Sequence, residues 1–134
     1  MKRTLTTFLI DDDNDDQEIF LFVMKEVSKG AECVFADDGI DALEKIKTNA
    51  SFIPDVIFID INMPKMNGVK CLSEIKKIHR LKNVPVYMYS TSAEVPIVEE
   101  CKKLGATGFI KKYIDTSDLK DELLKIVSQL KMTA

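Results

Sequence analysis

Cysteine is scarce in this chain, and no cysteine pattern points to a disulfide or a zinc site. The three cysteines, Cys33, Cys71 and Cys101, are odd in number, widely spaced and form no CxxC pair. Disulfide frameworks and zinc sites both need paired, regularly spaced cysteines. The sequence therefore predicts reduced thiols in a cytoplasmic protein.

Long apolar runs and an excess of positive charge are also absent. No stretch approaches the roughly 20 apolar residues that a membrane-spanning helix needs. The basic residues near the N-terminus are not followed by the apolar segment of a signal peptide. The net charge is -3, whereas surfaces that bind nucleic acid are normally basic. We therefore expect neither a membrane nor a nucleic acid as a partner.

What the chain contains is a regular alternation of short apolar runs with amphipathic segments. The runs are typical of strands buried on both faces of a parallel sheet, and they cover residues 8–10, 33–36, 56–59, 86–89 and 108–111. No linker or repeat interrupts the alternation, and 134 residues suffice for one domain with a real core. We expect a single domain over residues 1–134, with its core at about 5–131 and no output domain.

Five strands that alternate with five helices predict an α/β fold. The expected architecture is flavodoxin-like, a (βα)5 doubly wound parallel five-stranded sheet with strand order 2-1-3-4-5. Helices are expected at residues 15–28, from Asp37 or Asp38 to about 47, at 69–79, at 93–104 and from Asp115 or Ser117 onward. Ile19 and Ile40 are expected on the apolar faces of the first two helices.

Polar side chains follow four of the predicted strands. They are Asp11 and Asp12 after the first strand, Asp60 after the third, Ser90 after the fourth and Lys112 after the fifth. Ligands bind beyond the carboxyl ends of the strands in such sheets, at the switch point between strands one and three. These side chains are therefore the candidate functional residues.

Three carboxylates in one crevice predict a metal site. Asp11, Asp12 and Asp60 would repel one another unless a cation joined them. Mg²⁺, or Mn²⁺ in its place, suits such a group of oxygen ligands. Asp12 would bind the metal directly and Asp11 through water, and the backbone carbonyl of Asn62 is the expected further ligand.

A carboxylate beside a metal and a lysine can act as a nucleophile toward phosphorus. Asp60 is the best candidate, because it ends the most apolar and most central strand. Lys112 and the metal would offset charge on the transferring phosphoryl oxygens. Ser90 could donate a hydrogen bond to one of those oxygens, and Phe109 could rotate into the space that Ser90 leaves. Ser90 and Phe109 are thus a candidate switch.

Several stretches closely resemble the receiver domain of two-component response regulators. They are LIDDD at residues 9–13, IDINMPKMNG at 59–68, Ser90-Thr91, and GATGFIKK at 105–112. The resemblance implies that Asp60 accepts a phosphoryl group from a histidine kinase or a histidine phosphotransfer protein, with Mg²⁺ required and slow hydrolysis afterwards. It implies a signalling phosphoacceptor in a two-component system or phosphorelay, and not an enzyme that turns over an external substrate.

The resemblance further implies a stand-alone receiver that signals through the face formed by helix 4, strand 5 and helix 5. The sequence names no downstream partner and leaves open whether the chain forms a homodimer. Three residues depart from the family's pattern: Tyr113 where proline is usual, Phe109 where tyrosine is frequent, and Thr91 where a smaller side chain is favoured. We expect the loop after the fifth strand to differ in shape, because a cis bond before a residue other than proline costs about 3 kcal/mol.

Two other functions are compatible with parts of the pattern. A phosphatase of the haloacid dehalogenase type would use Asp11-x-Asp13, but Asn14-Asp15 stands where that class has Gly-Thr or Gly-Val. An interaction module that works without phosphate would keep its partner affinity after Asp60→Asn. A calcium loop of the EF-hand type is excluded, because Asp16 stands where glycine is required. Asp16 is interpreted, with Asp15, as a solvated helix N-terminus.

Overall fold

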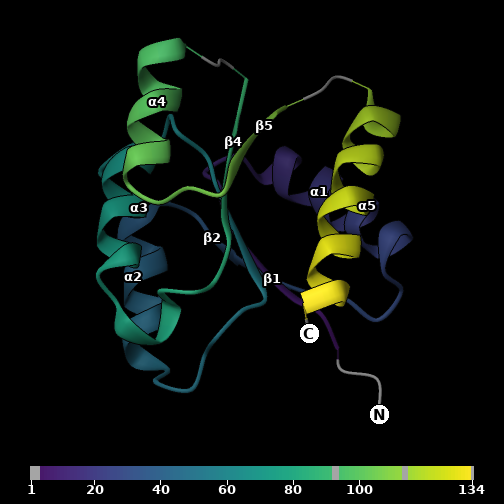
Figure 1. Ribbon diagram of the computed structural model, residues 1–134, viewed down its shortest axis with the longest axis horizontal. Helices are drawn as coiled ribbons and strands as arrows, with labels where there is room; N and C mark the ends of the chain where they lie inside the picture. The colour runs from purple at the N-terminus through teal and green to yellow at the C-terminus, as the bar shows by residue number, and fades with distance from the viewer. Residues whose placement is uncertain (1–3, 92–93, 113–114, 134) are drawn as a thin grey trace.

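The computed structural model describes residues 4–91, 94–112 and 115–133 (Figure 1). Its centre is one parallel five-stranded sheet of order β2-β1-β3-β4-β5. The strands are β1 (Thr6–Ile10), β2 (Glu32–Ala36), β3 (Val56–Ile59), β4 (Val86–Ser90) and β5 (Gly108–Lys111). The predicted fold class and strand order are confirmed.

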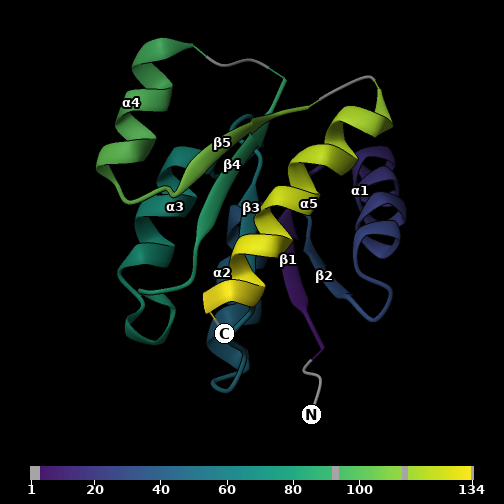
Figure 2. The ribbon, with the colours of Figure 1, turned by 45° about the vertical axis from the view of Figure 1, so that its right-hand side comes forward.

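Helices cover both faces of the sheet: α1 and α5 lie on one face, and α2, α3 and α4 lie on the other (Figure 2). The helices are α1 (Asn14–Val27), α2 (Gly39–Thr48), α3 (Gly68–Lys76), α4 (Val95–Lys103) and α5 (Thr116–Thr133), and a 3-10 turn, η1, covers His79–Leu81. Across the described residues, no helix is both long enough and apolar enough to cross a membrane.

The sheet separates two apolar cores, and β3 contributes to both. Successive side chains of a strand point to opposite faces, so Phe58 packs toward α1 and α5 while Ile57 and Ile59 pack toward α2 and α3. All three side chains are fully buried. This burial on both sides fixes β3 at the centre of the sheet, and with it the position of Asp60 at its carboxyl end.

Two expectations about helix faces were wrong. Ile19 is 42% exposed and Ile40 is 47% exposed. Each residue lies roughly 90° to 110° around the helix axis from the centre of the buried face, at the edge of the apolar stripe. The helix expected over residues 69–79 ends at Lys76 and is followed by η1. The expected start of the fourth helix at residue 93 lies outside the described residues.

Gly68 lets the loop after β3 fold back against the backbone of Asp60. The Gly68 N–H donates to the carbonyl oxygen of Ile61 at 2.8 Å. A Cβ atom at position 68 would lie 2.2 Å from the carbonyl oxygen of Asp60, far inside van der Waals contact. Asn67 caps α3 by accepting a hydrogen bond from the Lys70 N–H at 2.9 Å. The start of α3 is thus tied to the end of β3.

We expect Gly68→Ala to lower the free energy of unfolding by about 1 to 3 kcal/mol, because a backbone carbonyl cannot move aside as a flexible side chain can. Urea-induced unfolding in EDTA measures the effect. Gly30→Ala is the matched control, since a Cβ atom at position 30 meets no atom within 4 Å. Equal stability of the two variants would contradict the close approach.

Candidate functional site

The sheet's own hydrogen bonds place the functional side chains together at its carboxyl edge. The Asp11 N–H donates to the carbonyl of Ala36 at 3.0 Å, and the Asp60 N–H donates to the carbonyl of Ile10 at 2.9 Å. The Lys112 N–H donates to the carbonyl of Ser90 at 2.8 Å. These bonds continue the strand pairing by one residue, so the side chains that follow β1, β3 and β5 converge.

The Lys112 ammonium lies among three carboxylates. Its Nζ atom is 2.7 Å from Asp16 Oδ2, 2.8 Å from Asp11 Oδ2 and 3.4 Å from Asp60 Oδ2. The lysine side chain is only 9% exposed, and Nζ lies 5.2 Å from the centre of the Tyr89 ring. Lys112 is therefore the cation of a largely buried charge cluster, as its place after the fifth strand predicted.

Asp16 and Tyr89 are the members of this site that the sequence interpretation missed. Asp16 was assigned to a solvated helix terminus; it lies in the first turn of α1 as expected, but it is not simply solvated, because its carboxylate pairs with Lys112. Asp15 is exposed, as expected. The position of Asp16 in the sequence could have indicated its role. It lies in the first turn of the helix that follows Asp11 and Asp12, and such a turn lies beside the cleft at the strand ends. Tyr89 carried no signal beyond its place in an apolar strand.

Oxygen atoms of Asp11, Asp12 and Asp60 lie within 4.8 Å of one another, as a shared cation would require. Asp11 and Asp60 are buried, whereas Asp12 is exposed in an open cleft that Asn62 and Thr91 also line. The predicted group of carboxylates is therefore present, and solvent reaches it from the side of Asp12.

The carboxylate group fits a hard divalent cation. Asp11 Oδ2 is fully buried, and the cation that meets it, the Lys112 ammonium at 2.8 Å, is shared with Asp16 and Asp60. Buried anionic oxygens are costly unless enough positive charge compensates them, and one ammonium does not suffice for three carboxylates. The donor set consists of carboxylate oxygens, which Mg²⁺ and Mn²⁺ prefer. Asp11, Asp12 and Asp60 are the residues that would hold such an ion.

In the absence of a metal, burial disfavours the ionised forms of Asp11 and Asp60. Burial, with the nearby charge of Asp11, raises the pKa of Asp60 to about 6 against the opposing charge of Lys112. Burial also raises the pKa of Asp11. Burial alone would lower the pKa of Lys112, but its contacts with Asp11 and Asp16 outweigh this effect and raise it. The cluster therefore has less positive charge than its carboxylates require.

Ser90 lies at the end of β4, and its side chain is fully buried. Among the described residues, none forms a hydrogen bond with Ser90 Oγ. Phe109 is half-buried and packs against the core under α2 and α3. The structure thus shows a core contact for Phe109, and its rotation stays a prediction.

Asn62 is exposed, and its N–H donates to Asp60 Oδ1 at 3.3 Å. The metal-binding role of its carbonyl stays a prediction. Thr91 is exposed and lines the same cleft as Asp60. Tyr113, and with it the expected change in the loop after β5, lies outside the described residues.

Residues 7–124 match the family model described as response regulator receiver domain. The chain belongs to this family. The match runs from β1 into α5 and includes every strand end at the site. The receiver resemblance of the sequence motifs is thereby confirmed.

Known proteins show the same similarity. The chain is 43% identical over 112 residues to protein-glutamate methylesterase/protein-glutamine glutaminase 3 of Rhodospirillum rubrum. The aligned region covers 81% of this chain but only 28% of that relative. The phosphorylated cyanobacterial phytochrome response regulator RcpA superposes with a TM-score of 0.87 at 26% identity, covering 98% of this chain and 97% of RcpA. The Mn²⁺-bound form of the response regulator Rcp1 superposes with a TM-score of 0.80 at 26% identity, covering 92% of each chain.

We expect Asp60→Asn to raise the free energy of unfolding in EDTA at pH 7 by about 1 to 2 kcal/mol, because it removes a charge whose burial is unfavourable. The folded-state pKa of about 6 exceeds the ordinary value of 3.8. The native state therefore binds the proton more tightly, and wild-type stability improves as the pH falls from about 6 toward 4.

The gain from Asp60→Asn should accordingly be complete above about pH 7 and absent below about pH 4. Urea unfolding across this range measures it, with Asp121→Asn on the exposed face of α5 as the control. A gain that is independent of pH would show that the Asp60 charge is not its cause.

Proposed function

We propose that Asp60 accepts a phosphoryl group from the phosphohistidine of a histidine kinase or a histidine phosphotransfer protein, with Mg²⁺ or Mn²⁺ held by Asp11, Asp12 and Asp60. The observation that carries the proposal is the contact of one buried ammonium with several carboxylates at the edge of an open cleft. Membership of the receiver family and the similarity to a phosphorylated regulator support it.

The reaction is a displacement at phosphorus. A carboxylate oxygen of Asp60 forms a bond to phosphorus, and the bond from phosphorus to the imidazole nitrogen breaks. The electron pair of the broken bond stays on the imidazole nitrogen, so the donor leaves as neutral histidine once the ring holds one proton. A pKa of about 6 leaves Asp60 mostly ionised at neutral pH, which a nucleophile requires.

The neighbouring side chains would stabilise the transferring group. Lys112 lies beside Asp60 and would offset negative charge on a phosphoryl oxygen. Ser90 Oγ has a hydroxyl proton that no described residue receives, so it is free to donate to a second oxygen. The divalent ion, when bound, supplies further positive charge at the phosphoryl oxygens. Asp60 would be covalently modified, and the protein would catalyse only its own phosphorylation and slow dephosphorylation.

The consequence of phosphorylation would be a change of the surface formed by α4, β5 and α5. Once Ser90 turns toward the phosphoryl group, Phe109 on the neighbouring strand could move into the space that it leaves. A protein partner that binds this surface would then detect the phosphorylated state. The stand-alone character and the cytoplasmic location that the sequence predicted stay predictions.

We expect Lys112→Ala to slow labelling by acetyl phosphate about tenfold or more, because the positive charge beside the transferring oxygens is lost. Mg²⁺ affinity, measured by calorimetry, should not fall, since the lysine competes with the metal for the same carboxylates. Lys111→Ala is the matched control, because Lys111 is the exposed last residue of β5 and directly precedes Lys112. An unaltered labelling rate in Lys112→Ala would remove Lys112 from the site.

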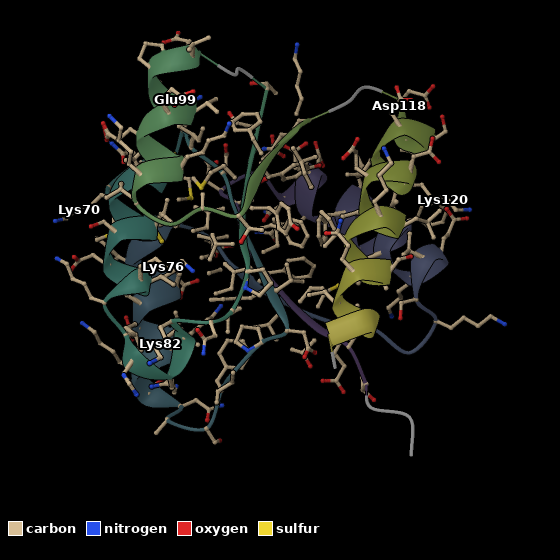
Figure 3. All side chains as sticks on the ribbon, viewed as in Figure 1. Lys70, Lys76, Lys82, Glu99, Asp118 and Lys120 are labelled. Carbon is tan, nitrogen blue, oxygen red and sulfur yellow. The ribbon has the colours of Figure 1, made fainter. Side chains whose placement is uncertain are left out.

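The proposed function is tested by intact-protein mass after incubation with acetyl phosphate, in Mg²⁺ or in EDTA. We expect the wild type to gain one phosphoryl group only in Mg²⁺, and Asp60→Asn to gain none. Asp118→Asn should label like the wild type, because Asp118 is an exposed residue in the first turn of α5 (Figure 3) and does not belong to the carboxylate group of Asp11, Asp12 and Asp60.

Labelling of Asp60→Asn at full stoichiometry would contradict the assignment of the nucleophile. Many turnovers of an aryl phosphate would favour the phosphatase alternative. No adduct in any variant, despite Mg²⁺ binding by calorimetry, would favour a module that works without phosphate.

A further inference from the structure

The carboxylates around Lys112 fall into two kinds. Asp11 and Asp60 belong to the group whose oxygens converge on a shared cation position. Asp16 stands outside that group and comes from the first turn of α1, yet its Oδ2 atom accepts the shortest of the three contacts with Lys112 Nζ, at 2.7 Å. This contact joins α1 to the residue that follows β5. Asp16 is not one of the carboxylates that would hold the metal, so binding of a metal does not account for the contact.

Asp16 is held firmly in this position. The Asp13 side chain caps α1 and accepts hydrogen bonds from the backbone N–H groups of Asp15 and Asp16 at 2.9 and 3.3 Å. One turn further along α1, the ring of Phe20 is fully buried and meets the ring of Tyr89 edge-on at 5.9 Å. Tyr89 is the ring beside which the Lys112 ammonium lies. Asp16 and Lys112 are therefore positioned by the same packed unit.

We infer that Asp16 is a positioning residue, which holds the Lys112 ammonium in the unphosphorylated protein and competes with the phosphoryl group for it. This inference rests on the proposed phosphorylation of Asp60. The ammonium stands closer to Asp16 than to Asp60, at 2.7 Å against 3.4 Å. A phosphoryl oxygen on Asp60 would therefore compete with Asp16 for the Lys112 ammonium.

The number of donors on the lysine explains why competition arises. An ammonium group has three N–H donors, and three carboxylates already surround Lys112. A phosphoryl oxygen can gain a donor only if one carboxylate loses its own. The Asp16 side chain is 31% exposed, whereas those of Asp11 and Asp60 are 0% and 8% exposed. Water can therefore hydrate Asp16 after release, so it is the carboxylate that gives up the lysine at least cost.

Rate constants for labelling by acetyl phosphate in Mg²⁺ test the inference. Asp16→Asn should label about threefold faster or more, the size expected when a partly exposed ion pair is removed. Asp16→Glu keeps the charge and should stay within about twofold of the wild type. Asp15→Asn removes the same charge from the neighbouring exposed position and should leave the rate unchanged.

The acceleration must act through Lys112. In the Lys112→Ala background, Asp16→Asn should change the remaining labelling rate less than twofold. A second measurement needs neither metal nor phosphate: urea unfolding in EDTA of the wild type, both single variants and the double variant. The effects of Asp16→Asn and Lys112→Ala on the unfolding midpoint should be non-additive, because the two side chains are in contact.

Each result decides between the two proposals. If the wild type is labelled and Asp16→Asn is labelled at an equal or slower rate, the competition by Asp16 is overturned and the phosphorylation of Asp60 stands. Equal acceleration by Asp15→Asn, or acceleration that persists without Lys112, would show a general effect of charge and would also overturn it. Absence of labelling in the wild type would contradict both the proposed function and this inference.

Discussion

The structure of the site depends on one buried ammonium group. The sheet brings the carboxylates of Asp11 and Asp60 to its carboxyl edge, where burial opposes their ionisation. Lys112 enters the same place from the end of β5 and offsets part of this charge. One positive charge cannot balance Asp11, Asp16 and Asp60 together. The shortfall explains why the same cluster suits a divalent cation.

The rest of the molecule holds this unfavourable arrangement in place. β3 is buried between two apolar cores, so the end of the strand cannot move outward to hydrate Asp60. The loop after β3 is closed against the Asp60 backbone at Gly68. On the other side, α1 is fixed against the sheet through Phe20. Packing of the apolar cores therefore holds the carboxylates close together, although their negative charges repel one another in the absence of a metal.

The sequence was sufficient to predict the features that depend on strand order. Apolar runs and turn residues indicated which residues end each strand, and the parallel order then brought Asp11, Asp60 and Lys112 together. Residues whose role depends on helix rotation were not predictable in this way. Asp16 faces the cleft because α1 begins at Asn14, and Ile19 is exposed because the buried stripe of α1 is narrow. A shift of one residue changes the direction of a side chain by about 100° on a helix, beyond the precision of sequence patterns.

Chemical identification of the residue that carries the acyl phosphate tests most directly whether Asp60 is the phosphoacceptor. Borohydride reduces an aspartyl phosphate to homoserine and leaves free carboxylates unchanged, so peptide mass spectrometry after labelling with acetyl phosphate identifies the modified residue. We expect homoserine at Asp60 alone, and only when Mg²⁺ or Mn²⁺ is present. Homoserine at Asp11 or Asp12, or at Asp60 in EDTA, would contradict the view that the charge cluster is a metal-dependent phosphoacceptor site.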